Sequence, residues 1–105
     1  MSVEQQVLVL NQILEMMHRS AGSKYDTMRC EFKYETYDGG WSVDLKYSLV
    51  RNGVFVSKFL DDPEDRVPQL VHELHELMEA HTGGRWHGFV LALDENGRAN
   101  SSFDY

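Results

Sequence analysis

Apolar residues at helical spacing open the chain. Between residues 3 and 19 they return every three or four positions, which places them on one face of a helix. The predicted apolar stripe consists of Val3, Val7, Leu10, Leu14 and Met17. Ser2 followed by Gln5 has the spacing of a capping box, and Gly22 is suited to end the helix. We therefore predict an amphipathic helix over residues 3–19.

The pattern then changes to strict alternation, which is typical of antiparallel strands with one wet face. Residues 28–35 and 41–50 alternate in this way, and the turn Asp38-Gly39-Gly40 separates them. The apolar members are Met28, Cys30, Phe32 and Tyr34 in the first run and Trp41, Val43, Leu45, Tyr47 and Leu49 in the second. Both runs are predicted to be strands of one sheet.

A third strand is predicted after Asn52-Gly53, because this dipeptide favours a two-residue hairpin loop. Such a loop pairs Val50 with Phe55. Both side chains then lie on the face of the sheet opposite to the one that carries the core residues. A second helix or a β-bulge covering this pair is the simpler interpretation. The alternative is that a partner covers it, which makes Val50 and Phe55 a candidate apolar interface.

Two prolines shape the next helix. Pro63 suits a first helical turn, but Pro68 does not fit the interior of a helix that already runs from residue 63. We expect a helical turn near 63–66, capped by Asp61 or Asp62, and a main helix over 68–81 that Gly83-Gly84 ends. Its apolar stripe is predicted to contain Val67, Leu70, Val71, Leu74, Leu77 and Met78.

A closing hairpin completes the chain. Residues 89–93 alternate up to a turn at 94–97, and residues 99–105 return. The predicted order α-β-β-β-α-β-β indicates an α+β fold with an antiparallel sheet of about five strands and two helices packed on one face. At 105 residues, the chain is expected to be a single domain, residues 1–105.

Charge is distributed unevenly along this fold. The whole chain has a formal net charge of -7, yet residues 1–58 carry equal numbers of acidic and basic side chains. The excess lies in the C-terminal half, above all between residues 61 and 79. A field of one sign favours a positively charged partner and repels nucleic acid and anionic membranes. The candidate acidic binding residues are Asp61, Asp62, Glu64, Asp65, Glu73 and Glu76. The simpler interpretation of such a run is a solvated helix face.

The cellular compartment is predicted from the cysteine content, the N-terminal residues and the length of the apolar stretches. Cys30 is the single cysteine, so no disulfide forms within the chain. The first twenty residues have no basic leader, and polar residues interrupt their apolar ones, so we expect no signal peptide. No stretch reaches the roughly 18 apolar residues of a membrane span. A reduced, cytoplasmic setting is predicted.

The run His72-Glu73-Leu74-His75-Glu76 nearly matches a zinc-protease helix. That motif needs histidines at i and i+4, whereas the second histidine here comes at i+3. His72, His75 and Glu76 define the alternative of a small metal-dependent enzyme. Because a zinc site needs three or four convergent ligands, we expect both histidines to lie at the polar edge of the helix, hydrogen-bonded to nearby carboxylates, with no metal, no cofactor and no catalytic residue. Cys30 is expected to pack rather than react.

From Val54 onward the pattern resembles the YezG-like immunity proteins. The matching features are a strand pair before an acidic helix (61–80), then Arg85-Trp86 leading into residues 89–94, a glycine turn, and the closing Phe103-Asp104-Tyr105. The resemblance implies a small cytoplasmic antitoxin that binds and silences a toxin, often a nuclease. An acidic protein suits a nuclease that is basic where it grips nucleic acid.

The predicted function is therefore a non-catalytic immunity protein that neutralises a cognate basic toxin through its acidic surface. A homodimer that uses Val50 and Phe55 as its contact, with a role elsewhere, is a further alternative.

Overall fold

The computed structural model describes residues 3–22 and 24–105, apart from the side chains of Val3 and Thr82. The elements are α1 (Val3–Ala21), β1 (Thr27–Tyr37), β2 (Gly40–Arg51), β3 (Val54–Lys58), α2 (Val67–Thr82), β4 (Gly88–Leu93) and β5 (Ala99–Asp104). Their order confirms the predicted α+β succession.

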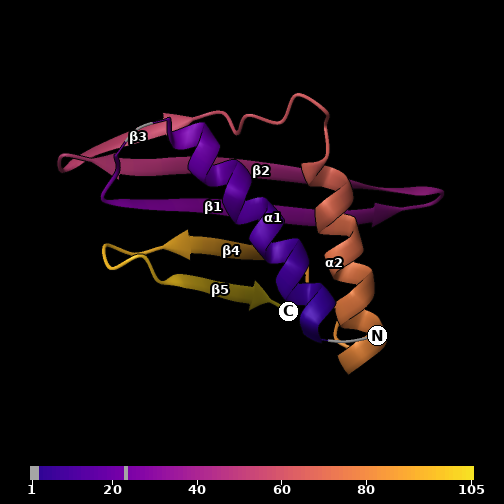
Figure 1. Cartoon of the computed structure of the whole chain (residues 1–105). Helices are drawn as coiled ribbons and strands as arrows, with labels where there is room; N and C mark the ends of the chain where they lie inside the picture. Colours follow the sequence, from indigo (N-terminus) through magenta and orange to yellow (C-terminus); the bar gives the residue numbers. More distant parts are fainter. Residues whose placement is uncertain (1–2, 23) are drawn as a thin grey trace.

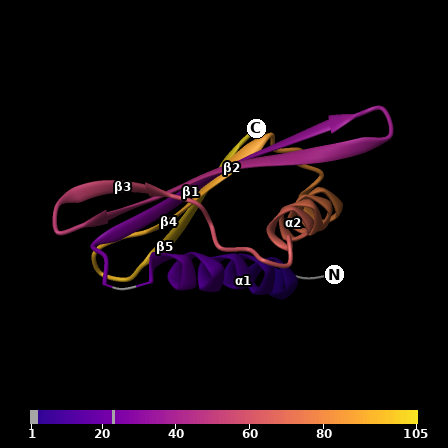
Figure 2. The ribbon, with the colours of Figure 1, turned by 90° about the horizontal axis from the view of Figure 1, so that it is seen from above.

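The five strands form one antiparallel sheet in the order β3-β2-β1-β4-β5. Both helices lie on the same side of it, as Figures 1 and 2 show. The fold therefore has two layers, and within the part of the chain that the structure describes the second face of the sheet carries no helix. This arrangement confirms the prediction that the helices pack on one face.

The core lies between the sheet and the helices. β1 is the central strand, and its even-numbered residues from Met28 to Tyr34 are buried while their neighbours are exposed. The predicted alternation is confirmed in β1. In β2 the odd-numbered residues face the core, with Tyr47 and Leu49 buried and Trp41, Val43 and Leu45 half-buried.

The predicted apolar stripe of α1 is partly wrong. Val7, a member of that stripe, is 48% exposed, although Val9 in the same turn is buried. At 3.6 residues per turn Val7 lies about 120° around the helix from the fully buried Ile13, so the buried face is turned away from it. The buried side is instead formed by Val9, Ile13, Met16, Met17 and Ala21, with Leu10 and Leu14 half-buried beside it. Ser2 of the predicted capping box lies outside the described residues.

α2 begins one residue before the prediction, at Val67, with Pro68 in its first turn. The carboxylate of Asp62 accepts hydrogen bonds from the backbone N–H groups of Arg66 (2.8 Å) and Val67 (2.7 Å). Of the two predicted caps, Asp62 is therefore the one whose side chain holds the start of α2. The predicted helical turn at 63–66 is wrong, because these residues form a non-helical turn with Asp65 at a φ of 53°. Gly83, with a φ of 75°, ends the helix as expected, and its N–H bonds to the Glu79 carbonyl.

The pairing of Val50 with Phe55 is confirmed by the register of β2 and β3. The expectation that a helix or a bulge covers this pair is wrong. Both helices occupy the other face (Figure 2), the register runs without interruption, and Phe55 is 68% exposed. Within the described residues, no helix has the length and apolar character that crossing a membrane requires.

Candidate protein-binding surface

We use the name acidic surface for the six predicted residues Asp61, Asp62, Glu64, Asp65, Glu73 and Glu76. The structure places them in two neighbouring groups. Four precede α2 in the loop that leads from β3, and two lie one turn apart on the exposed side of α2. All are exposed except Asp62, which is half-buried.

Asp62 has a structural role. Its two carboxylate oxygens are occupied by the N–H groups of Arg66 and Val67, which the first turn of a helix otherwise leaves without a partner. Its backbone carbonyl also accepts a hydrogen bond from the N–H of Asp65. Asp62 therefore shapes the loop and is less available to a partner than its neighbours.

The remaining loop carboxylates have no cationic partner. Among the residues that the structure describes, Asp61, Glu64, Asp65 and Glu73 take part in no ion pair. The nearby Arg66 directs its guanidinium to the Gln12 side-chain oxygen, at 3.2 Å. The negative charge of this region is therefore not compensated within the fold.

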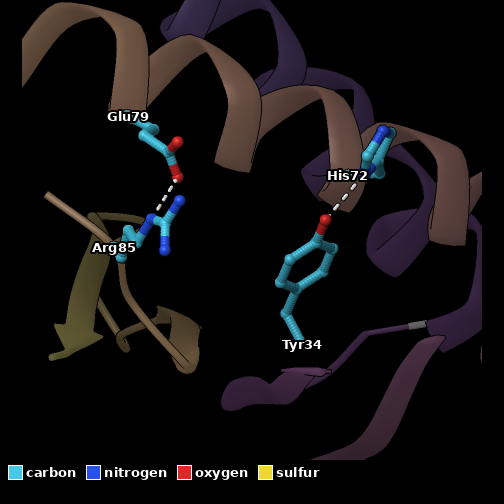
Figure 3. Close-up of polar contacts among 4 residues, drawn as sticks. All are labelled: Tyr34, His72, Glu79 and Arg85. Atoms are coloured by element: carbon cyan, nitrogen blue, oxygen red, sulfur yellow. Dashed lines mark hydrogen bonds and ion pairs between the residues drawn. The ribbon is translucent and has the colours of Figure 1, made fainter. Parts of the chain in front are cut away.

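The two carboxylates farther along α2 each have a side-chain contact. Glu76 Oε1 lies 3.5 Å from His72 Nε2, which carries charge only when protonated, and Glu79 Oε2 lies 3.1 Å from Arg85 Nε (Figure 3). Both glutamates line a groove together with residues 34–36 of β1. The acidic surface is therefore strongest at the start of α2 and weaker toward its end.

His72 is held on both sides. Its Nδ1 lies 2.8 Å from the Tyr34 hydroxyl (Figure 3), and its ring stacks on Trp41 at a centroid distance of 4.3 Å. Burial, and then Glu76 and Glu79, raise the pKa of Tyr34, so this phenol stays protonated at neutral pH. His72 therefore joins the helix to the sheet through Tyr34 and Trp41.

His75 is more deeply buried, at 8% exposure. Its ring stacks on Tyr34 at 4.3 Å and meets Trp86 edge-on at 4.7 Å. Burial lowers its pKa, although Glu79, a hydrogen bond to the Trp86 backbone and Glu76 act in the opposite direction. His75 thus differs from the prediction of two equivalent histidines at the polar edge of the helix.

The two histidines do not assemble a metal site with the neighbouring carboxylates. In the described part of the chain, no group of three or more His, Cys, Asp or Glu side chains converges. Cys30 is fully buried, and burial and then Glu31 raise its pKa to about 12, so its thiol stays protonated. The geometry therefore gives the metal-dependent alternative no ligand set.

A groove of about 1140 Å³ opens between α2, the end of β1 and the Arg85–Gly88 segment. Carboxylates line its rim, among them Glu35, Glu76 and Asp104. Its wall includes Trp86, whose buried indole Nε1 has no hydrogen-bond partner. The sequence did not predict this groove, because its lining comes from α2, β1, β4 and β5, which only the tertiary fold brings together.

A second apolar feature lies on the open face of the sheet. Phe59, directly after β3, is 97% exposed, and together with Phe55 it lines a groove of about 780 Å³. Strand alternation would have placed Phe59 on the same side as Phe55, so the signal was present in the sequence. The candidate interface at Val50 and Phe55 therefore extends to the start of the acidic loop.

No family model matches the chain. A protein of Stenotrophomonas maltophilia with the name "Chorionicgonadotropic hormone-like protein" is 33% identical over 78 residues, which are 72% of this chain and 18% of that protein. The chain therefore spans less than a fifth of the length of this relative.

Proposed function

We propose that this protein is a non-catalytic immunity protein of the cytoplasm, which binds and neutralises a basic protein toxin. The observation that carries the proposal is the group of exposed carboxylates without ion-pair partners at Asp61, Glu64, Asp65 and Glu73. Exposed charges of one sign steer an oppositely charged protein and raise its association rate. A nuclease, whose substrate is itself acidic, offers such a basic surface.

The resemblance to YezG-like immunity proteins supports the same function. The Stenotrophomonas relative shows that a segment similar to this chain also occurs within a much longer bacterial protein.

The test is co-expression with the product of the neighbouring gene, which we expect to be the toxin. Cells that express this product should be rescued by the wild-type protein, and the two purified proteins should associate more slowly as salt is added. No complex at low salt together with no rescue would defeat the proposal.

A matched pair of variants distinguishes the effect of carboxylates in the acidic surface from the effect of the net charge of the protein. Asp61→Asn, Glu64→Gln and Asp65→Asn together should slow association by about tenfold, within the range that electrostatic steering spans. The control removes three exposed carboxylates elsewhere, through Glu4→Gln, Glu15→Gln and Glu95→Gln. Asp62 is left intact because it caps α2. Equal effects of the two triple variants would show that only net charge matters.

The exposure of Phe55 and Phe59 supports a second candidate, a homodimer that buries this apolar patch. Light scattering of the wild type and of Phe55→Glu tests it. A dimer that the substitution converts to a monomer would support it, whereas a monomer in both cases would remove it.

A further inference from the structure

The second strand of the sheet is much longer than its outer neighbour. β3 pairs with β2 only from Tyr47 to Arg51, so among the described residues no strand pairs with residues 40–46 of β2 on the side away from β1. Figure 2 looks onto this edge and shows that the chain after β3 leaves the plane of the sheet and runs through the helix layer. The position that β3 would occupy if it continued is therefore open.

The register determines which backbone groups face this open position. In a two-residue hairpin the flanking residues, here Arg51 and Val54, form a hydrogen-bonded pair. Every second residue back along β2 then directs its N–H and C=O to the same side. Beyond β3 these residues are Leu45, Val43 and Trp41. Among the described residues, no backbone hydrogen bond from another segment reaches them.

This part of β2 has few of the features that protect an edge. Natural sheets shield exposed edges with prolines, bulges, very short strands, charged side chains or a covering segment. Residues 40–46 include two exposed charged residues, Asp44 and Lys46, but they contain no proline, and their pairing with β1 is continuous from Gly40 to Val50. An edge of this kind is able to accept another strand.

The surroundings of the edge indicate what kind of strand fits. On the open face of the sheet, the 97% exposed Phe59 stands beside Leu45 and Lys46 in the 780 Å³ groove. On the helix side, the loop that carries Asp61, Glu64 and Asp65 passes through the helix layer at the same border of the molecule (Figures 1 and 2). A strand here would meet an apolar surface on one side and carboxylates without partners on the other.

We propose that the Trp41–Leu45 edge of β2 binds an extended, basic segment of the partner protein by strand addition. Lysine or arginine at alternate positions would face the acidic loop, and apolar residues between them would contact Phe59. This mode of docking deepens the proposed function, on which it rests for the identity of the partner as a basic protein.

Val43 gives a direct test of the edge. Its N–H points into the open position and donates no hydrogen bond to β1. Val43→Pro therefore removes a hydrogen-bond donor only from the edge. At the next residue, Asp44, a proline would interrupt the ladder with Lys33. Val43→Thr is the matched control, because it alters the same half-buried side chain and keeps the N–H.

The probe is a displayed library of random twelve-residue peptides, selected on the immobilised wild-type protein. We expect the selected peptides to alternate basic and apolar residues. They should bind Val43→Thr within about twofold of the wild type and Val43→Pro at least tenfold more weakly. N-methylation of a selected peptide, measured on the wild-type protein, should abolish binding at every second residue only, because alternate N–H groups of an added strand point toward β2.

Three results would overturn the strand-addition mode: no basic peptide is selected, Val43→Pro binds the peptides as tightly as Val43→Thr, or N-methylation shows no alternation. The methylation pattern needs no variant and stands even where Val43→Pro fails to fold. Rescue of toxin-expressing cells by the wild-type protein is measured separately, because it tests the immunity function and not the strand-addition mode. Rescue by both the wild type and Val43→Pro would leave the immunity function standing and remove the edge as its binding site.

Discussion

The Trp41 ring lies parallel to the His72 ring, with 4.3 Å between the centroids and 5° between the planes. Trp41 stands near the tip of the β1–β2 hairpin, and His72 stands in the middle of α2. Because the hairpin continues past the start of β4, this contact holds the protruding part of the sheet against the helix. The hydrogen bond between His72 and Tyr34 reinforces it from β1.

Replacing Tyr34 with phenylalanine should test this connection. The substitution keeps the ring between His75 and Trp86 and removes only the hydroxyl that lies 2.8 Å from His72 Nδ1. We expect a loss of about 0.5–1.5 kcal/mol in the free energy of unfolding in urea. Tyr37→Phe is the control, because its hydroxyl contacts Ser42 at an exposed position and its removal should have a smaller effect.

The acidic loop offers two neighbouring aspartates with different roles. Asp62→Ala should destabilise the protein by about 0.5–2 kcal/mol, since it removes the cap of α2. Asp61→Ala should change stability by less than about 0.5 kcal/mol, because only the backbone N–H of Asp61 bonds to Ser20 Oγ and alanine preserves it. Thermal unfolding of both variants is the measurement, and equal losses would contradict the assignment of the cap.

Gly88 is required by a close approach of two strands. A Cβ atom at this position would lie 2.5 Å from the Phe32 carbonyl oxygen, so β1 or β4 would have to move. We expect Gly88→Ala to lower the free energy of unfolding by about 1–3 kcal/mol, as overpacking does. At Gly40, by contrast, the added Cβ meets nothing within 4 Å. Gly40→Ala should therefore be tolerated.

The burial of His75 should appear in the pH dependence of stability. Because burial lowers its pKa in the folded protein below the value of 6.5 for a free histidine, the unfolded chain binds this proton more readily. Stability should therefore be complete above pH 6.5, fall as the pH decreases below it, and level off once the folded protein is also protonated.

The variant for this measurement is His75→Phe, which keeps a ring between Tyr34 and Trp86 and cannot be protonated. Urea unfolding between pH 5 and pH 8, about the range over which an ordinary histidine titrates, should show a smaller pH dependence in His75→Phe than in the wild type. His81→Gln, at an exposed position, serves as the control. An unchanged slope in His75→Phe would contradict the role of His75.

Local patterns made most of the fold predictable. The alternation in residues 28–35, the Asn52-Gly53 turn and the stripe of α2 each depend on neighbours in the chain, and each is confirmed. The face of α1 was misplaced because apolar residues cover more than one side of this helix, and helical spacing alone does not show which side faces the sheet. Val7 fits the predicted stripe, yet the buried side is formed around Val9 and Ile13.

Of the acidic surface, only the concentration of carboxylates along the chain could be predicted. The sequence showed where carboxylates concentrate, and it named Asp62 as an alternative cap, but it did not show that the Asp62 side chain is occupied while its neighbours have no ion pair. The open edge of β2 could not be predicted either. It results from the unequal lengths of β2 and β3 and from the path of the chain after Lys58, which tertiary packing determines.

The position of β1 also constrains how the protein is made. Its partners are β2, the next strand in the chain, and β4, which is synthesised only after α2. On the ribosome, the first three strands can form a meander early, while the other side of β1, with the backbone of Phe32 and Cys30, stays without a partner until β4 emerges. The nascent chain therefore exposes an unpaired edge of its central strand until β4 is synthesised, and chaperone contact during translation should concentrate there.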